Sequence, residues 1–407
     1  MIYKLNANSK NFQKKLIKKI NKRSVFSDKD YNVSKKIVSD VKKNGDKAVL
    51  KYEIKFNKNR KLKTNYSDIS KNIKNLNSKV KKSIDFAFGR ILSFHKNQKT
   101  KDIKFSDNLK NTINYKYKPL SSVGIYIPGG NASFPSTVLM NAIPAMLAGV
   151  KRIVVVNPVR GKDQSAAVLY AARKCGVKEI YRVGGAQAIA ALTYGTKTIP
   201  RVDKIVGPGN IYVAAAKKIV FGEVGIDMIA GPSEITVVAD KSSNVKWVAA
   251  DLIGQAEHDI NAQCILISKK KEIIDRVQKE LKIQLQSLPR KKIALGSLKK
   301  NGVLIFANTD KKISEIINLI APEHLELSID KFKSILNNVK NAGSICTGKY
   351  SAMAVTDYCA GSNHTLPTHS SAKFFSGLSV FDFFKRISYI NLSKKGIETI
   401  GEKVINL

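Results

Sequence analysis

Gln255 and His258 lie three residues apart near the end of NVKWVAADLIGQAEH (244–258), a stretch whose pattern predicts a helix. Residues with this spacing share one face of a helix, so both side chains are expected to point to the same side. Histidine is the commonest metal-ligand type, whereas glutamine is an unusual zinc ligand. Taken alone, the pair is compatible with a zinc site and also with an ordinary structural histidine.

Two further groups could take part in the same chemistry. Asp357 lies in AVTDYCAGSNH, a Gly- and Ser-containing loop suited to presenting a carboxylate, and His364 follows in the same segment. Glu323 and His324 are adjacent in APEHLEL, after Pro322 and before an apolar strand, where a turn can direct both side chains into one cleft. Their ordinary pKa values, about 4.3 and about 6.5, suit two different proton transfers. The alternative is a helix-capping Glu beside a hydrogen-bonded His.

The elements that must position these residues form two successive α/β patterns. Residues 119–237 alternate short apolar strands with helices, and residues 238–375 repeat the alternation. This order predicts βαβ units, parallel sheets and two lobes with a cleft between them. Each strand of the first lobe ends in a Gly-rich turn before a helix, where backbone N–H groups and the helix dipole favour anions. No complete GxGxxG with a downstream acidic residue is present, so the motif alone indicates dinucleotide binding only in part.

The regions on either side of the two lobes differ from them in composition. Residues 1–118 are polar and lysine-rich with helical periodicity, which predicts a helical N-terminal segment packing on the lobes. Residues 376–407 are interpreted as a helical C-terminal arm. At ~150 residues per domain, a chain of 407 residues is expected to hold two or three domains.

The formal net charge of +40 could indicate a nucleic-acid partner. However, 60 of the 71 basic residues are Lys and 11 are Arg, although Arg forms the forked contacts to phosphate and guanine. Abundant Asn beside Lys points instead to A/T-rich codons and a solvated surface. We expect no nucleic-acid partner, with polyanion binding as the alternative.

The cysteine spacing and the length of the apolar runs indicate the cellular compartment. Cys175, Cys264, Cys346 and Cys359 form no CxxC pair, which is typical of a reduced cytoplasmic protein. No stretch approaches ~18 apolar residues, and the N-terminus lacks the apolar core of a secretory signal. We therefore expect a cytoplasmic protein without a membrane partner.

Eight segments of the chain, in order and with matching spacing, resemble the histidinol dehydrogenase family. They are YIPGG (126–130), VGGAQAIAAL (183–192), VDKIVGPGN (202–210), DMIAGPSE (227–234), QAEHD (255–259), APEHLEL (321–327), DYCAGSNHTLPT (357–368) and SGLSVFDFFKR (376–386). The resemblance runs from about residue 20 to the end of the chain. It implies an aldehyde-dehydrogenase-like architecture and the oxidation of L-histidinol to L-histidine through the aldehyde, with two NAD⁺ reduced, as the last step of histidine biosynthesis.

The resemblance also implies roles by motif position. It implies zinc ligands at Gln255, His258 and Asp357, with one Zn²⁺ per subunit. The implied substrate contacts are Ser233, Gln255, His258, His324, Asp357 and His364. The implied NAD contacts are Tyr126, Gln187 and Asn210. Glu323 and His324 become the acid/base pair, with His324 taking the alcohol proton and Glu323 activating the water that adds to the aldehyde.

The family continues beyond the arm with a Glu and a His that reach the active site across an intertwined homodimer, the His as the fourth zinc ligand. This chain stops at Leu407, and no histidine follows His369. The expectation is therefore either a truncated sequence or a zinc site with one open position, with His369 as a candidate substitute. The alternatives to an active dehydrogenase are an impaired homologue, a zinc-dependent hydrolase and a polyanion-binding protein.

Overall fold

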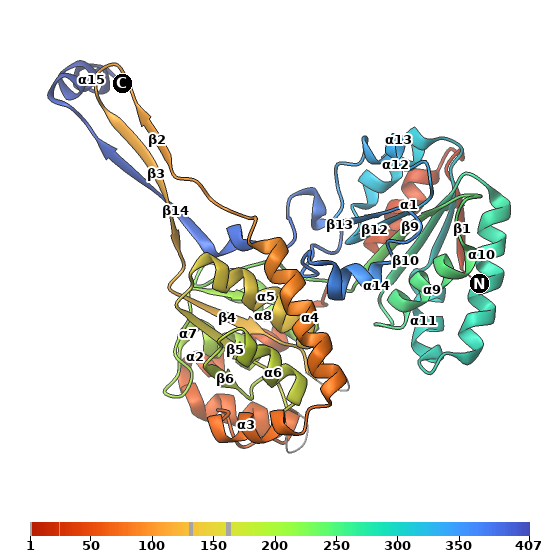
Figure 1. Ribbon diagram of the computed structural model, residues 1–407, viewed down its shortest axis with the longest axis horizontal. Coiled ribbons are helices and arrows are strands. Elements are labelled where there is room, and N and C mark those ends of the chain that lie inside the picture. The colour runs from red at the N-terminus through yellow and green to blue at the C-terminus, as the bar shows by residue number, and fades with distance from the viewer. Residues whose placement is uncertain (1, 24, 130–132, 160–163) are drawn as a thin grey trace.

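The computed structural model describes residues 2–23, 25–129, 133–159 and 164–407, and it divides into two α/β lobes and a projecting arm (Figure 1). The motif YIPGG therefore ends at Gly130, outside the described residues. Across the described part of the chain, no helix has both the length and the apolar character needed to cross a membrane.

The first lobe is built on a five-stranded parallel sheet. Its order is β6-β5-β4-β7-β8, with β4 (Ser122–Tyr126), β5 (Arg152–Val156), β6 (Glu179–Tyr181), β7 (Lys204–Val206) and β8 (Gly225–Ile226). Four helices connect the strands: α5 (Pro135–Ala148), α6 (Ala166–Lys174), α7 (Gly185–Tyr194) and α8 (Ile211–Val220). The strands are apolar almost throughout because helices cover both faces of the sheet.

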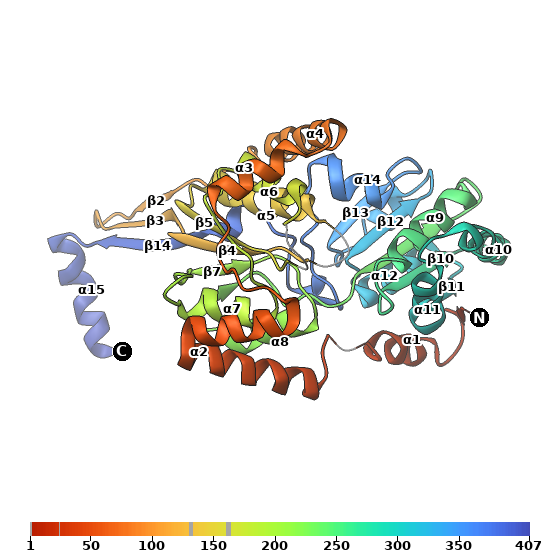
Figure 2. The same cartoon turned by 90° about the horizontal axis from the view of Figure 1, so that it is seen from below.

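The N-terminal helices complete the covering of this sheet. They are α2 (Asp28–Asn57), α3 (Tyr66–Lys74) and α4 (Ser78–His95). Helix α2 packs along α7 and α8 on one side, whereas α3 and α4 pack against α6 and α5 on the other (Figure 2). These N-terminal helices thus pack on the first lobe.

The second lobe contains a six-stranded parallel sheet in the order β1-β11-β10-β9-β12-β13. The strands are β1 (Tyr3–Asn6), β9 (Glu234–Ala239), β10 (Gln263–Ser268), β11 (Val303–Phe306), β12 (His324–Ser328) and β13 (Ser344–Thr347). The helices are α1 (Phe12–Asn21), α9 (Val245–Ala256), α10 (Lys271–Ser287), α11 (Lys291–Asn301), α12 (Asp310–Ile320), α13 (Lys333–Leu336) and α14 (Met353–Val355). The prediction of two α/β lobes with parallel sheets is thus confirmed.

The N-terminal segment contributes strands that its helical periodicity did not predict. Strand β1 pairs in parallel with β11, so the first residues of the chain belong to the second lobe. Strands β2 (Ile103–Ser106) and β3 (Thr112–Pro119) lie in the arm. In addition, β9 of the second sheet begins at Glu234, so a lobe boundary at 237/238 would divide that strand.

The C-terminal arm is only partly helical, which corrects the prediction of a helical arm. Its strand β14 (Phe384–Asn391) pairs antiparallel with β3 over eight residues, and only α15 (Lys394–Asn406) is a long helix. The segment FKRISYIN is rich in aromatic and β-branched residues, which favour a strand once a partner is present. That partner lies far away in the sequence, so helical periodicity was the misleading signal. The three strands and α15 project away from both lobes (Figure 1).

Candidate functional site

Both sheets have the same winding, with a change of direction at one point. In the first lobe the chain proceeds from β4 through β5 to β6 and then returns to β7 on the other side of β4. In the second lobe it proceeds from β9 through β10 to β11 and returns to β12 beside β9. Such switch points leave a crevice at the edge of a sheet, where ligands bind.

The predicted cofactor residues gather at the carboxyl edge of the first sheet. Tyr126 is the last residue of β4, Gln187 lies in the first turn of α7 after β6, and Asn210 caps α8 after β7. The Tyr126 hydroxyl accepts a hydrogen bond from the Gly185 N–H at 3.1 Å, which joins the ends of β4 and α7. Asn210 Oδ1 accepts from the N–H groups of Tyr212 and Val213, so its amide nitrogen remains directed outward from the helix cap.

A glycine allows the turn after β7 to pass close to the end of β4. Gly207, after β7, has φ +104°, and a Cβ built on it would lie 2.3 Å from the Tyr126 carbonyl oxygen. Only glycine adopts this conformation without strain and leaves room for the neighbouring backbone. The Gly207 N–H donates to Asp227, which also pairs with the buried Lys217, so the turn before Asn210 is held from inside the lobe.

The predicted acid/base pair lies at the amino end of the second sheet, whereas the predicted cofactor residues lie at the carboxyl end of the first. Glu323 directly precedes β12 and His324 is its first residue, after Ala321 ends α12 in a left-handed conformation. Both side chains are buried. Glu323 Oε2 accepts the Glu234 N–H at 2.8 Å and lies 3.7 Å from His324 Nδ1. The turn therefore places both members of the pair against the start of β9.

The His324 ring is held between two acceptors. Nδ1 lies 3.1 Å from the Glu234 carbonyl oxygen, and Nε2 lies 3.0 Å from Asp357 Oδ1. The Glu234 carbonyl oxygen can only accept, so Nδ1 donates to it, and Nε2 lies within hydrogen-bonding distance of the Asp357 carboxyl group. Burial alone would lower the pKa of His324, but the carboxylates of Glu323 and Asp357 outweigh it and raise the pKa to about 9.

For Glu323, the effect of burial on the pKa is larger than the opposing effect of its neighbours. Burial raises its pKa to about 7, although the charge of His324 and the hydrogen bond from the Glu234 backbone act to lower it. A carboxyl group with this pKa can both accept and release a proton near neutral pH, which is the property required of a general acid/base.

Asp357 lies in a π-helical turn, Thr356–Ala360, rather than in the open loop predicted from its Gly and Ser neighbours. Such turns are rare and frequently occur at functional sites. The Asp357 carbonyl accepts from His364 Nδ1 at 3.0 Å, which leaves the Nε2 of His364 as an acceptor. Burial lowers the pKa of His364, and the charges of Asp357, His324 and His258 also act on it. Asp357, His364, His324 and His258 therefore form one cluster.

The segment that carries Asp357 is anchored to the first lobe and its N-terminal helices. Arg90 of α4 donates to the carbonyls of Cys359 and Ala360, and Asn363 donates to the Met140 carbonyl in α5. Because this segment contacts both lobes, it fixes the cluster of the second lobe relative to the first.

Gln255 and His258 approach the cluster from α9. Helix α9 ends at Ala256, so His258 lies in the turn beyond it, where its N–H still donates to the Gln255 carbonyl at 3.2 Å. Gln255 is buried, and its Nε2 has no hydrogen-bond partner among the described residues. Within the described ranges, no three His, Cys, Asp or Glu side chains are grouped to hold a metal. The predicted trio contains only two such residues, and its third member is this buried amide.

Ser233 precedes β9, beside a buried ion pair that sequence reasoning missed. Arg23 lies 2.9 Å from Glu234 Oε1 and donates to the Pro232 carbonyl, while the His369 N–H donates to the same carboxylate. This pair fixes the backbone on both sides of Ser233. Glu234 stands in the quoted GPSE segment, but Arg23 lies in a lysine-rich region with no motif to mark it. His369, the candidate substitute for the fourth zinc ligand, therefore lies beside Arg23 and Glu234.

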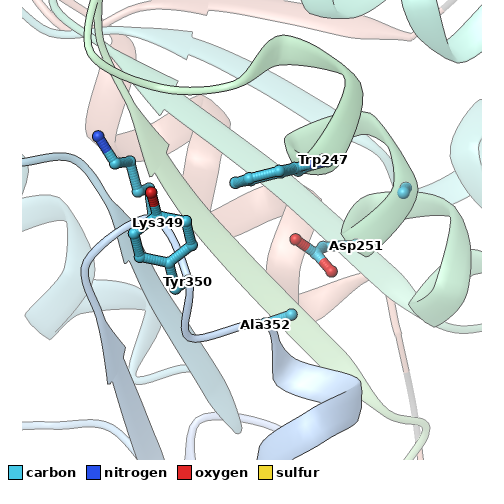
Figure 3. A pocket seen from close by; sticks show the side chains of 6 residues that line it. Trp247, Asp251, Lys349, Tyr350 and Ala352 are labelled. Carbon is cyan, nitrogen blue, oxygen red and sulfur yellow. The ribbon is translucent and has the colours of Figure 1, made fainter.

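A neighbouring hollow of about 300 Å³ lies between α9 and the segment 349–352. Trp247 and Tyr350 face one another across it, with their ring centroids 5.9 Å apart, and Asp251 lies toward its floor (Figure 3). Asp251 is one helical turn before Gln255 and is electrostatically paired with Glu326 of β12. No predicted site residue lines this hollow, so it is separate from the cluster.

Comparisons with known proteins cover the whole site. The histidinol dehydrogenase family description matches residues 21–407. The chain is 58% identical over 408 residues to the histidinol dehydrogenase of Pelagibacter ubique (strain HTCC1062), covering 100% of this chain and 95% of the relative. It is 45% identical over 371 residues to that of Acinetobacter baylyi, covering 90% and 86%. The crystal structure of histidinol dehydrogenase from Elizabethkingia anophelis matches with a TM-score of 0.93 at 37% identity, covering 100% and 94%.

The buried carboxyl pair leads to a prediction on pH and stability. Burial, together with the Asp251 charge, raises the pKa of Glu326 to about 9 from 4.5, so the folded protein retains a proton that the unfolded chain releases. The stabilisation is complete below the unfolded pKa and is lost as the pH rises toward about 9. The slope can reach about 1.4 kcal/mol per pH unit for one proton. Urea unfolding at pH 6 and pH 9 should show a smaller loss of stability in Glu326→Gln than in the unmodified protein.

The exposed Glu272 of α10 provides the matched control, since Glu272→Gln should keep the original slope. If the stability of Glu326→Gln depends on pH as steeply as that of the unmodified protein, Glu326 does not retain a proton in the folded state.

Proposed function

This chain belongs to the histidinol dehydrogenase family, whose members oxidise histidinol to histidine in histidine biosynthesis, and on that premise we propose how its two lobes divide the chemistry. The carboxyl edge of the first sheet binds NAD, and the amino edge of the second binds the metal and the substrate. The observation that carries the proposal is the contact of buried Glu323 and His324, two groups of shifted pKa, with each other and with the half-buried candidate metal ligand Asp357.

The proposed Zn²⁺ ligands are Gln255, His258 and Asp357. Their fit is supported by the buried Gln255 amide, whose Nε2 makes no hydrogen bond to any residue that the structure describes, because rotation of the amide can present its oxygen to a cation without breaking a contact of that nitrogen. When bound, the metal would hold the imidazole and amine of the substrate and so fix the reacting carbon. Ser233, His324 and His364, with the three ligand residues, are the proposed substrate contacts, and His364 Nε2 is available as an acceptor.

In the first oxidation the alcohol loses its O–H proton to His324, and NAD⁺ held at the carboxyl edge of the first sheet would take the hydride from its carbon. His324 is held as a cation by its hydrogen bonds to Asp357 and Glu234. A ring that already carries both protons has no lone pair, so His324 must first release its Nε2 proton, by way of Asp357 to solvent, before Nε2 can take the proton of the alcohol. The buried position of the ring keeps bulk water away from this transfer.

In the second oxidation water adds to the aldehyde carbon, and Glu323 accepts the proton that the water loses. A second NAD⁺ would take the hydride from the resulting hydrate, and the acid so formed would release its remaining proton to solvent as the carboxylate. A pKa of about 7 supports this role, because the same carboxyl can return the proton to solvent between turnovers.

Tyr126, Gln187 and Asn210 are the proposed NAD contacts. They are supported by their common position at the switch-point edge of the first sheet, where strand order reverses between β4 and β7. The buried Oε1 of Gln187 has no hydrogen-bond partner among the described residues, so it can receive a donor from the cofactor.

A homodimer is proposed from the arm. The arm carries apolar side chains that neither lobe covers, including Ile390 at 65% exposure and Ile405 at 85%. Apolar residues on a thin projecting element need a second surface to bury them. The four free cysteines support a reducing compartment and hence the proposed cytoplasmic location. Family membership does not favour the impaired homologue, the hydrolase or the polyanion-binding alternative.

Glu323→Gln tests the division of labour in the acid/base pair. Because Gln cannot accept the proton from water, oxidation of histidinal should fall by about 10²–10⁴-fold, the usual worth of a general base. Oxidation of histidinol to histidinal should fall much less. Single-turnover measurement of NADH from each substrate separates the two steps, and the exposed Glu315→Gln serves as the control. Equal loss of both steps would refute the assignment of Glu323.

The double variant Ile390→Asp/Ile405→Asp tests the arm. Two buried charges would oppose association, so light scattering after size exclusion should give the mass of one chain for this variant and two chains for the unmodified protein. Ile283→Asp, at a position on α10 that is 51% exposed, should remain dimeric. A monomeric unmodified protein, or a dimeric arm variant, would exclude this interface.

A further inference from the structure

Glu53 of α2 is a carboxylate enclosed within the first lobe, with 0% exposure. Its Oε1 accepts two hydrogen bonds, from the Gly184 N–H at 2.9 Å and from Gln187 Nε2 at 2.8 Å. Its Oε2 accepts from Asn57 Nδ2 at 2.8 Å. Burying a carboxylate is costly unless its oxygens are hydrogen-bonded. Helix α2, which carries Glu53, lies beside α7 (Figure 2), and Oε1 contacts the turn between β6 and α7, the edge that carries the proposed cofactor contacts.

Glu53 changes what this turn can bind. Gly184 caps the N-terminus of α7, and its N–H already donates to Glu53, while the N–H of Gly185 donates to Tyr126. These two donors are therefore not available to a phosphate, and a carboxylate lies directly behind them. The expectation that each Gly-rich turn of this lobe favours an anion does not hold here. A part of a ligand that carries no negative charge suits the turn better.

Glu53 also fixes the polarity of the Gln187 amide. An amide side chain can usually be reversed, because its oxygen and nitrogen ends have the same shape. A carboxylate only accepts, so the Gln187 nitrogen must face Glu53 and the oxygen must face away. That oxygen is buried and has no hydrogen-bond partner among the described residues, and Gln187 itself is only 1% exposed. A buried acceptor left without a donor is costly, which points to a donor supplied by a ligand.

We propose that Glu53 is a positioning residue for the dinucleotide: it orients Gln187 so that Oε1 accepts an N–H or O–H from the nicotinamide-riboside part of the cofactor, which carries no phosphate, and it keeps phosphate away from the start of α7. This inference rests on the proposed NAD site of the first lobe. The donor is either the carboxamide of the nicotinamide ring or a ribose hydroxyl, and both have the same hydrogen-bonding chemistry.

Four variants of the full chain test the proposal by NADH affinity, measured by titration calorimetry without substrate. Gln187→Leu removes the oriented acceptor, and Glu53→Met removes the group that orients it. Each should weaken NADH binding by about tenfold, the usual effect of one hydrogen bond. Glu53→Gln should bind NADH as the unmodified protein does, because its amide oxygen can accept the same two donors. Asn57→Ala is the matched control, since it removes only the contact to the other carboxylate oxygen.

The double variant Glu53→Met/Gln187→Leu separates positioning from general loss of structure. If Glu53 acts through Gln187, the double variant binds NADH no more weakly than Gln187→Leu alone. Additive losses, an equal loss in Asn57→Ala, or normal affinity in Glu53→Met would overturn the positioning role. If Gln187→Leu, Tyr126→Phe and Asn210→Ala all keep normal affinity, the proposed NAD site itself fails.

The analogue with an acetyl group in place of the carboxamide identifies the donor. If Oε1 accepts from the carboxamide, the unmodified protein prefers NADH over the analogue and Gln187→Leu loses that preference. If it accepts from a ribose hydroxyl, Gln187→Leu weakens both ligands by the same factor. An analogue that binds Gln187→Leu as tightly as the unmodified protein, together with unchanged NADH affinity, contradicts both.

Discussion

The His324 ring, held between the Glu234 carbonyl and the Asp357 carboxylate, is the interaction on which the rest of the site depends. It joins three separate pieces of chain: the start of β9, the start of β12 and the π-helical turn. A charged ring in a buried position is stable only because two acceptors and a nearby carboxylate compensate for its lost hydration. Removal of any one of them leaves a charge that the remaining groups do not balance.

This dependence extends outward through Glu234. Its N–H binds Glu323, its carbonyl binds His324, and its side chain pairs with Arg23. One residue therefore fixes the acid, the base and the backbone beside Ser233. Because Arg23 belongs to the N-terminal segment and Asp357 to a segment held by α4 and α5, both the N-terminal region and the first lobe support the geometry of the second.

The two lobes use opposite edges of their sheets. The proposed cofactor contacts follow the carboxyl ends of β4, β6 and β7, whereas Glu323, His324 and Ser233 precede β12 and β9. The crevice rule for parallel sheets accounts for the first edge. It does not account for the second, where buried titratable groups replace backbone donors as the functional elements. This division suits a reaction in which one partner carries phosphates and the other carries protons.

Sequence patterns predicted the lobes well, because alternating strands and helices leave a local signal. They also brought together Glu323, His324 and Asp357, which the structure joins by direct contacts. Patterns failed where a role depends on a distant partner. Glu53 bonds to a backbone 131 residues away, Arg23 reaches β9, and β14 needs β3 before its alternation acquires meaning. The π-helical turn around Asp357 also has no periodic signature.

The proposed metal site is the claim that joins these features, and diffraction at the zinc absorption edge tests it most directly. Crystals of the zinc-loaded protein should show an anomalous peak at about 2.0–2.2 Å from the side chains of Gln255, His258 and Asp357. Asp357 should then have released His324. A peak bonded to other residues, or a zinc-loaded protein in which Asp357 remains on His324 away from the peak, would contradict the account.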